Sequence, residues 1–173
     1  MATIKDATEA FNKFANGLEG VIKSAIADNK LQAVDYVQEQ LYSGMNGKDK
    51  PLRPTYIEDP WFKSEESGRW YMNAKGYLKW KKDITPPLPS YLGFQPRNDN
   101  TPNLIITGDF YSSITAIPIT DGIRIETRGT SFGSDIEKKY GSVILGIGPS
   151  AKKHFIKYVL NPALKEYFAK FGL

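Results

Sequence analysis

The chain has 173 residues, of which 24% are charged and 13% aromatic, and its formal net charge is +4 at pH 7. A chain of this length can bury a sizeable core without covalent cross-links, which suits one domain. The absence of cysteine excludes disulfides, thiolate metal sites and cysteine nucleophiles, and the single histidine, His154, would leave a metal site dependent on carboxylates.

The beginning of the chain predicts a helix or a helix pair. Apolar residues recur at helical spacing over residues 4–26 and again over residues 31–41. Thr3 is the expected N-cap, with Asp6 as its capping partner, and Gly44 is a natural stop. No apolar core of a signal peptide and no run long enough to span a bilayer is visible, so we expect a protein made in a cytoplasm with no membrane partner.

The next segment, residues 45–102, has a different composition. Its prolines prevent long regular structure, while its many aromatic residues argue against disorder. A short helix or hairpin is expected within residues 68–82, where residues 77–80 alternate in part like a strand. We interpret the segment as a long aromatic and proline-rich insertion that packs on its own domain or on a neighbouring subunit.

From Asn103 onwards the pattern favours strands. Leu104-Ile105-Ile106 predicts a buried strand that ends at Thr107-Gly108-Asp109, and an amphipathic segment follows. Strands around residues 114–119 and 123–128 flank an Asp-Gly turn and predict a hairpin. A short helix capped by Ser134 and a buried strand over residues 143–147 complete this part.

A C-terminal helix is predicted from Ser150, its expected cap, with a kink or restart at Pro162. The fold class is therefore α+β, with an N-terminal helix or helix pair, a small antiparallel sheet and a C-terminal helix. We expect one domain over residues 1–173, with helical, irregular, strand-rich and helical segments at 1–44, 45–102, 103–149 and 150–173.

The candidate catalytic patterns are incomplete. The glycines around residues 141–148 lack the lysine of a phosphate loop and the third glycine of a dinucleotide fingerprint. His154 lies beside two lysines with no evident acid–base partner, and Ser112-Ser113 lacks the glycines of a nucleophile elbow. The acidic residues that could gather around a cation match no known loop spacing: Asp59, Glu65, Glu66 and Asp83. We therefore expect no enzyme activity, no cofactor and no metal.

Charge alternates along the chain. Residues 1–44 hold four lysines and six acidic residues, whereas residues 45–82 hold nine basic and five acidic ones. Residues 83–149 are again acidic by two charges, and residues 150–173 are basic by four. The basic and aromatic segment 69–82, with Lys79-Trp80-Lys81-Lys82 and the C-terminal lysines, could bind nucleic acid by stacking and phosphate neutralisation. A loop anchored by tryptophan with solvated lysines around it is the other interpretation.

Several short motifs occur in the order found in one family of phage proteins. Thr107-Gly108-Asp109-Phe110-Tyr111-Ser112-Ser113-Ile114 is followed by strands, by Lys139-Tyr140-Gly141 and by a helix containing Leu160-Asn161-Pro162. In this the chain resembles the tailed-phage virion morphogenesis or tail-completion proteins of the neck, or head–tail connector. Gln40-Leu41-Tyr42-Ser43-Gly44 with Lys50-Pro51-Leu52-Arg53-Pro54 is similar to the variant in phages of Bacteroidetes-type hosts. The insertion departs from the compact family pattern.

The resemblance implies an α+β structural virion protein that forms a homo-oligomeric ring, of 6 or 12 copies, between portal and tail. Neighbouring neck, portal or tail proteins would be its partners, the virion its location, and non-specific DNA contact in the lumen is possible. A ring needs a head-to-tail interface, and buried aromatic side chains commonly dominate such contacts. The expected subunit-interface residues are Trp61, Phe62, Trp70, Tyr71, Trp80, Tyr167 and Phe168.

Overall fold

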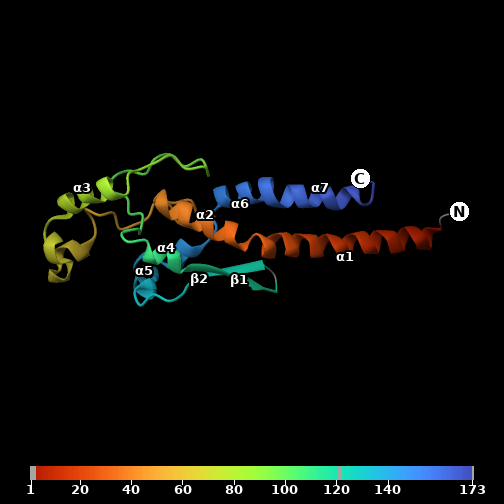
Figure 1. Cartoon of the computed structure of the whole chain (residues 1–173), viewed down its shortest axis with the longest axis horizontal. Helices are drawn as coiled ribbons and strands as arrows, with labels where there is room; N and C mark the ends of the chain where they lie inside the picture. The colour runs from red at the N-terminus through yellow and green to blue at the C-terminus, as the bar shows by residue number, and fades with distance from the viewer. Residues whose placement is uncertain (1–2, 121, 173) are drawn as a thin grey trace.

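A computed structural model describes residues 3–120 and 122–172 and has the α+β fold expected from the sequence. The molecule is elongated, with both ends of the chain near one end of its long axis (Figure 1). The elements, in chain order, are the helices α1 (Ile4–Asp28), α2 (Lys30–Tyr42), α3 (Ala74–Ile84), α4 (Asp109–Ser113), the strands β1 (Ile114–Ile119) and β2 (Gly122–Thr127), and the helices α5 (Gly133–Tyr140), α6 (Pro149–Phe155) and α7 (Asn161–Ala169).

The expected helix pair is confirmed as α1 and α2, which meet at Asn29. Thr3 and Asp6 form the predicted capping box, and the chain leaves α2 through Gly44 in a left-handed conformation (φ 70°). Helix α2 lies at the centre of the molecule, and six of its side chains are buried. Helix α1, by contrast, is exposed along its first third, before it reaches the other elements.

The C-terminal rod runs beside α1 (Figure 1). It comprises α6, a π-helical turn at Ile156–Leu160 and α7. Pro162 lies in the first turn of α7, directly after the π turn. The backbone dihedral angles of Ile156, Leu160 and Asn161 are all helical, so the rod continues through the proline and the predicted restart after Asn161 does not form. The helix begins at Pro149 with Gly148 as its cap, so the prediction that Ser150 caps it is wrong.

The main core lies where α2 meets α4, the hairpin and the segment before α6. Strands β1 and β2 pair antiparallel in the predicted hairpin, from Ile114 opposite Thr127 to Ile119 opposite Gly122; the turn residue Asp121 lies outside the described residues. The amphipathic segment after Gly108 is the short helix α4, which buries Phe110 and Tyr111. The buried members of this core are Val34, Val37, Leu41, Leu52, Phe110, Tyr111, Ile114, Ala116, Ile144 and Leu145.

Two of the strands expected in residues 103–149 do not form. Residues 103–106 are irregular: Leu104 has φ 56°, and Ile106 is 59% exposed. Side chains replace sheet partners there, because Tyr111 donates to the Asn103 carbonyl and Lys81 donates to that of Ile105. Residues Ser142–Leu145 form a single 3-10 turn in place of the expected strand. This turn places the Ile144 side chain in the core, where it is fully buried. Ser134 lies inside α5, so its predicted cap role is wrong too.

The insertion is more ordered than its prolines predict. It contains 3-10 helices at Pro60–Lys63 and Glu65–Trp70, followed by α3, which settles the helix-or-hairpin alternative in favour of the helix. The insertion packs on its own chain: Asp59 pairs with Lys139 of α5, and Lys81 donates to the Ile105 carbonyl. In Figure 1 it forms the end of the molecule opposite the termini.

Candidate functional site

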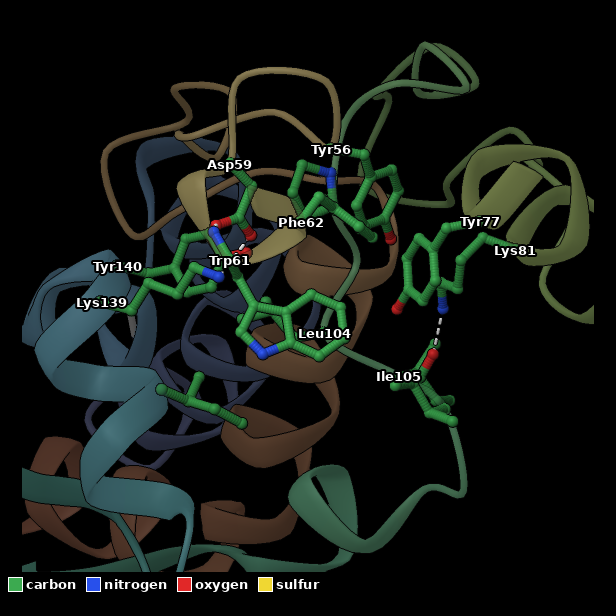
Figure 2. Close-up of a pocket in the computed structure, with 13 residues that line it drawn as sticks. Tyr56, Asp59, Trp61, Phe62, Tyr77, Lys81, Leu104, Ile105, Lys139 and Tyr140 are labelled. Atoms are coloured by element: carbon green, nitrogen blue, oxygen red, sulfur yellow. Dashed lines mark hydrogen bonds and ion pairs between the residues drawn. The ribbon is translucent and has the colours of Figure 1, made fainter. Parts of the chain in front are cut away.

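A pocket of about 240 Å³ lies between the insertion and the rest of the molecule (Figure 2). Three parts of the chain that are remote in sequence line it: the insertion, the irregular segment before α4, and α5. Most of the wall is apolar or aromatic, with a few polar side chains among it. The lining residues are Tyr56, Asp59, Trp61, Phe62, Tyr77, Lys81, Pro102, Leu104, Ile105, Ile106, Ile136, Lys139 and Tyr140.

Helix α3 supplies the first polar end of the pocket. Asn73 caps the helix by accepting from the Gly76 amide (3.0 Å). Tyr77 and Lys81 are four residues apart, so they project from the same face of the helix, and both are buried. Figure 2 shows the two side chains side by side, with Lys81 reaching the Ile105 carbonyl.

Lys81 is an uncommon buried cation. Its side chain is 1% exposed, and no carboxylate in the described ranges 3–120 and 122–172 forms an ion pair with it. Burial, and secondly the charge of Arg97, lower the pKa of Lys81 from 10.5 to about 8. The ammonium is therefore mostly charged at pH 7, although its surroundings disfavour the charge.

The second polar end of the pocket is the ion pair between Asp59 and Lys139. Asp59 is 6% exposed and also caps the 3-10 helix at Pro60 by accepting from the Trp61 amide (3.0 Å). Its carboxylate is thus held by a cation and a backbone donor, which satisfies a buried charge. In Figure 2 this pair lies beside Tyr140, away from Lys81.

The phenol groups of the pocket keep their protons at neutral pH. Burial raises the pKa of Tyr77 to about 12, with a further contribution from the negative charge of Asp59. Burial also raises the pKa of Tyr56 and of Tyr140 well above its usual range. These hydroxyl groups can donate hydrogen bonds to a bound group, but they are poorly suited to act as bases.

Four of the predicted interface residues lie in one aromatic cluster, which we define as Tyr56, Trp61, Phe62, Trp70, Tyr77 and Trp80. The Tyr77 ring is central, with centroids 5.0 Å from Phe62 and 5.4 Å from Trp70 and Trp80. Phe62 is buried within the chain, whereas Tyr71, just outside the cluster, is 50% exposed. Of the five interface residues predicted in the insertion, Tyr71 is the one with an exposed side chain, and a role for any of them at an interface stays a prediction.

The two C-terminal residues predicted at an interface pack against α1. Tyr167 stacks on Phe14 with centroids 5.5 Å apart and donates to the Phe14 carbonyl (2.6 Å). Phe168 contacts the same ring, with centroids 5.7 Å apart. These side chains join α7 to α1 within one chain, and any contact they make with another subunit stays a prediction.

The two tryptophans of the basic and aromatic segment 69–82 are half-buried and contact each other. Trp70 and Trp80 pack together (5.4 Å between centroids), and the Arg69 guanidinium lies 4.7 Å from the Trp70 centroid. Lys81 points into the pocket, while Lys82 pairs with Asp99 (2.8 Å). Helical periodicity therefore separates the lysines that the sequence places in one run.

Among the other residues that the sequence offered as catalytic or metal-binding candidates are His154 and four acidic residues. His154 Nδ1 lies 2.9 Å from the Tyr36 hydroxyl, and its ring lies 4.3 Å from that of Tyr158, so it links α6 to α2. Within the described part of the chain, Asp59, Glu65, Glu66 and Asp83 form no cluster able to hold a metal ion. Across residues 3–120 and 122–172, no helix has the length and hydropathy that a membrane span requires.

Comparison with protein-family models, with curated proteins and with solved structures finds no match. A functional assignment therefore depends on the residues and geometry of this chain. Sequence reasoning missed the pocket itself, because its walls come from segments up to 84 positions apart, at Tyr56 and Tyr140. One local signal was available: once α3 is drawn as a helix, the spacing of Tyr77 and Lys81 puts a lysine on the apolar face.

Proposed function

We propose that this chain is a structural virion protein that forms a homo-oligomeric ring in the head–tail connector of a tailed phage, as a tail-completion or head-closure component. The observation that best supports assembly is the uncovered first third of α1. Ile4 is 89% exposed and Phe11 68% exposed, although both continue the apolar stripe on which Phe14 meets α7. A stripe that is half covered within the chain suits a contact with a second copy.

The shape of the molecule also supports a ring subunit. Helix α1 projects past the hairpin at one end, and the insertion forms the other end (Figure 1). A head-to-tail contact joins two different surfaces and closes into a ring when the rotation is suitable. We place the projecting helix on one side of that contact, with 6 or 12 copies in the ring and neck, portal or tail proteins above and below it.

We propose a non-catalytic role, which the groups that converge in the pocket support. Its phenols keep their protons, Asp59 is held by Lys139, and His154 lies on another element. The lysines of the C-terminal rod, at 152, 153 and 157, are exposed and would allow non-specific DNA contact if they faced the lumen. A free-standing nucleic-acid-binding module is the weaker alternative, because the stacking surfaces of Trp70 and Trp80 are occupied.

Mass measurement and electron microscopy of the purified chain test the proposal. We expect a closed ring of defined copy number at micromolar concentration, and the same chain in purified virions by mass spectrometry. A monodisperse monomer at all concentrations, together with absence from particles, would contradict it. Salt-dependent retention of the monomer on DNA would favour the nucleic-acid alternative instead.

A further inference from the structure

Among the residues that the structure describes, none forms an ion pair with the Lys81 ammonium, which is costly in a folded protein. The Lys81 ammonium donates a hydrogen bond to the Ile105 carbonyl, which is a neutral group. Burying a cation without a counter-ion is unfavourable, and an apolar side chain of similar length would avoid that cost. A buried lysine that faces a pocket under these conditions is suited to meeting an anion from outside the chain.

The surroundings of Lys81 add donors and a second positive charge. Arg97 is 6% exposed and its Nη2 donates to the Thr85 carbonyl, whereas its Nε and Nη1 atoms have no hydrogen-bond partner in the described part of the chain. Arg97 is close enough to lower the pKa of Lys81. On the pocket side, the Tyr77 hydroxyl stays protonated. This end of the pocket therefore offers the Lys81 ammonium and the Tyr77 hydroxyl as donors, with the positive charge of Arg97 nearby but outside the lining.

The rest of the pocket indicates what kind of anion would fit. Asp59 and Lys139 neutralise each other, so Lys81 sets the net charge of the lining. The walls are formed mainly by Trp61, Leu104, Ile136 and other apolar side chains. The volume of about 240 Å³ lies below the range of roughly 300–1,000 Å³ typical of sites for drug-sized ligands. A small ligand with one charged end and an apolar body matches this arrangement.

We propose that the pocket binds a compact organic carboxylate with an aromatic or branched aliphatic body. Its carboxylate accepts hydrogen bonds from Lys81 and the Tyr77 hydroxyl, and its body lies against Trp61 and Leu104. The ligand supplies the negative charge that the described part of the chain does not place beside Lys81. This binding site is independent of ring assembly, so either proposal can fail without the other.

Phenylacetate is a suitable probe, with phenylacetamide as its neutral counterpart of nearly equal shape. Binding is followed by amide and tryptophan indole NMR shifts and by calorimetry on the full chain at pH 7. We expect phenylacetate to bind at least tenfold more tightly than the amide, with shifts at Trp61 and Ile136. Lys81→Met should reduce phenylacetate affinity at least tenfold, whereas Lys79→Met, an exposed lysine on the same helix, should leave it unchanged.

A pH series provides a test that needs no variant. Phenylacetate stays ionised throughout, so its affinity should fall about tenfold per pH unit above pH 8 as Lys81 loses its proton. Burial raises the pKa of Tyr56, Tyr77 and Tyr140 above the usual range, so these three phenols keep their protons between pH 7 and 9.

Three results would overturn the proposal. Equal affinity for the acid and the amide would mean an apolar cavity without anion recognition. Unchanged binding by a folded Lys81→Met variant would place the carboxylate elsewhere. No shift at 10 mM probe, combined with a change of oligomeric state in Lys81→Met, would show that the lysine meets a carboxylate of another protein chain instead.

Discussion

Asp59 and Lys81 are both charged and buried, yet their surroundings differ. Asp59 has a cation and a backbone amide as partners, whereas Lys81 has a carbonyl oxygen and lies near a second cation. The first arrangement joins the insertion to α5 and serves the fold. The second makes the folded state less favourable while the lysine is charged, and this cost can be measured.

We expect the stability of the chain to rise with pH between about 8 and 10. The pKa of Lys81 is near 10.5 in the unfolded chain and about 8 in the folded one, so the unfolded state binds more protons in this interval. The gain should be about 2 kcal/mol after allowance for solvent screening at the pocket. Above pH 10 the trend should reverse, because Tyr77 ionises near 10 when unfolded and near 12 when folded.

Urea unfolding at pH 7, 8, 9 and 10 measures this dependence. Lys81→Met should abolish the rise and be no less stable than the original chain at pH 7, since it removes an uncompensated buried charge. Lys79→Met serves as the matched control and should keep the rise. An identical pH profile for the original chain and Lys81→Met would show that Lys81 has an ordinary pKa.

At Gly108, the backbone conformation limits which residues can be substituted, whereas the space around it does not. Its φ is 97°, in the left-handed region, and an added Cβ would meet no atom within 4 Å. Replacement by valine should therefore cost about 1–2 kcal/mol of unfolding free energy through backbone strain alone. Gly108→Asn is the matched control and should cost less, because asparagine tolerates this region. Equal stability of the valine variant and the original chain in urea unfolding would contradict this reading.

At the scale of elements, the close approach of α1 and α7 determines how the C-terminal rod lies. A Cβ added at Gly17 would lie 2.3 Å from the Tyr167 hydroxyl oxygen, whereas at Gly20, one turn further along α1, it would meet nothing within 4 Å. Tyr167 cannot move freely, because it is buried and donates to the Phe14 carbonyl. Two glycines that weaken the helix equally by propensity thus have different roles in packing.

Alanine substitutions at these two positions should have opposite effects. Gly20→Ala should raise the unfolding free energy by roughly 0.5–1 kcal/mol, because alanine favours the helix. Gly17→Ala should lower it by about 1–3 kcal/mol, because the α1–α7 contact must open or Tyr167 must leave its position. Thermal and urea unfolding of both variants check the sign, and stabilisation by both would mean that the helices adjust without cost.

At the scale of the whole molecule, the projecting part of α1 exposes apolar side chains to solvent in the single chain. This part of α1 lies at the end of the long axis, beyond the hairpin (Figure 1), and it carries the exposed side chains of Ile4 and Phe11. Burying an isoleucine or phenylalanine side chain in a contact contributes about 1.5–3 kcal/mol each. Assembly through this region would therefore convert an exposed surface into an interface.

Phe11→Ser should separate folding from assembly. Because Phe11 is 68% exposed, the substitution should change the unfolding free energy of the monomer by no more than about 0.5 kcal/mol. We expect it to shift the oligomer towards monomer by at least tenfold in dissociation constant, measured by light scattering over a concentration series. Lys13→Ser, at another exposed position of the same helix, is the control. An unchanged oligomer in Phe11→Ser would exclude this part of α1 from the ring contact.

The sequence by itself determined the N-terminal helix cap, the end of α2 and the hairpin of this protein. The capping box at Thr3, the stop at Gly44 and the hairpin were all predictable, because caps, turns and periodicity act over a few positions. The same local signals failed for Leu104-Ile105-Ile106 and for residues 143–147, which have the composition of strands. A strand needs a partner, and side chains from Lys81 and Tyr111 satisfy the first of these segments instead.

Tertiary structure alone decided where the charges and aromatic rings lie relative to one another. It brought Asp59 to Lys139 and enclosed the pocket that Lys81 faces. It also buried Lys81 against the Ile105 carbonyl, while Lys79 and Lys82 of the same basic run stay exposed. These outcomes depend on contacts between residues far apart in the chain, whose energies no local pattern encodes, whereas the helices and the hairpin follow from backbone preferences that each segment carries by itself.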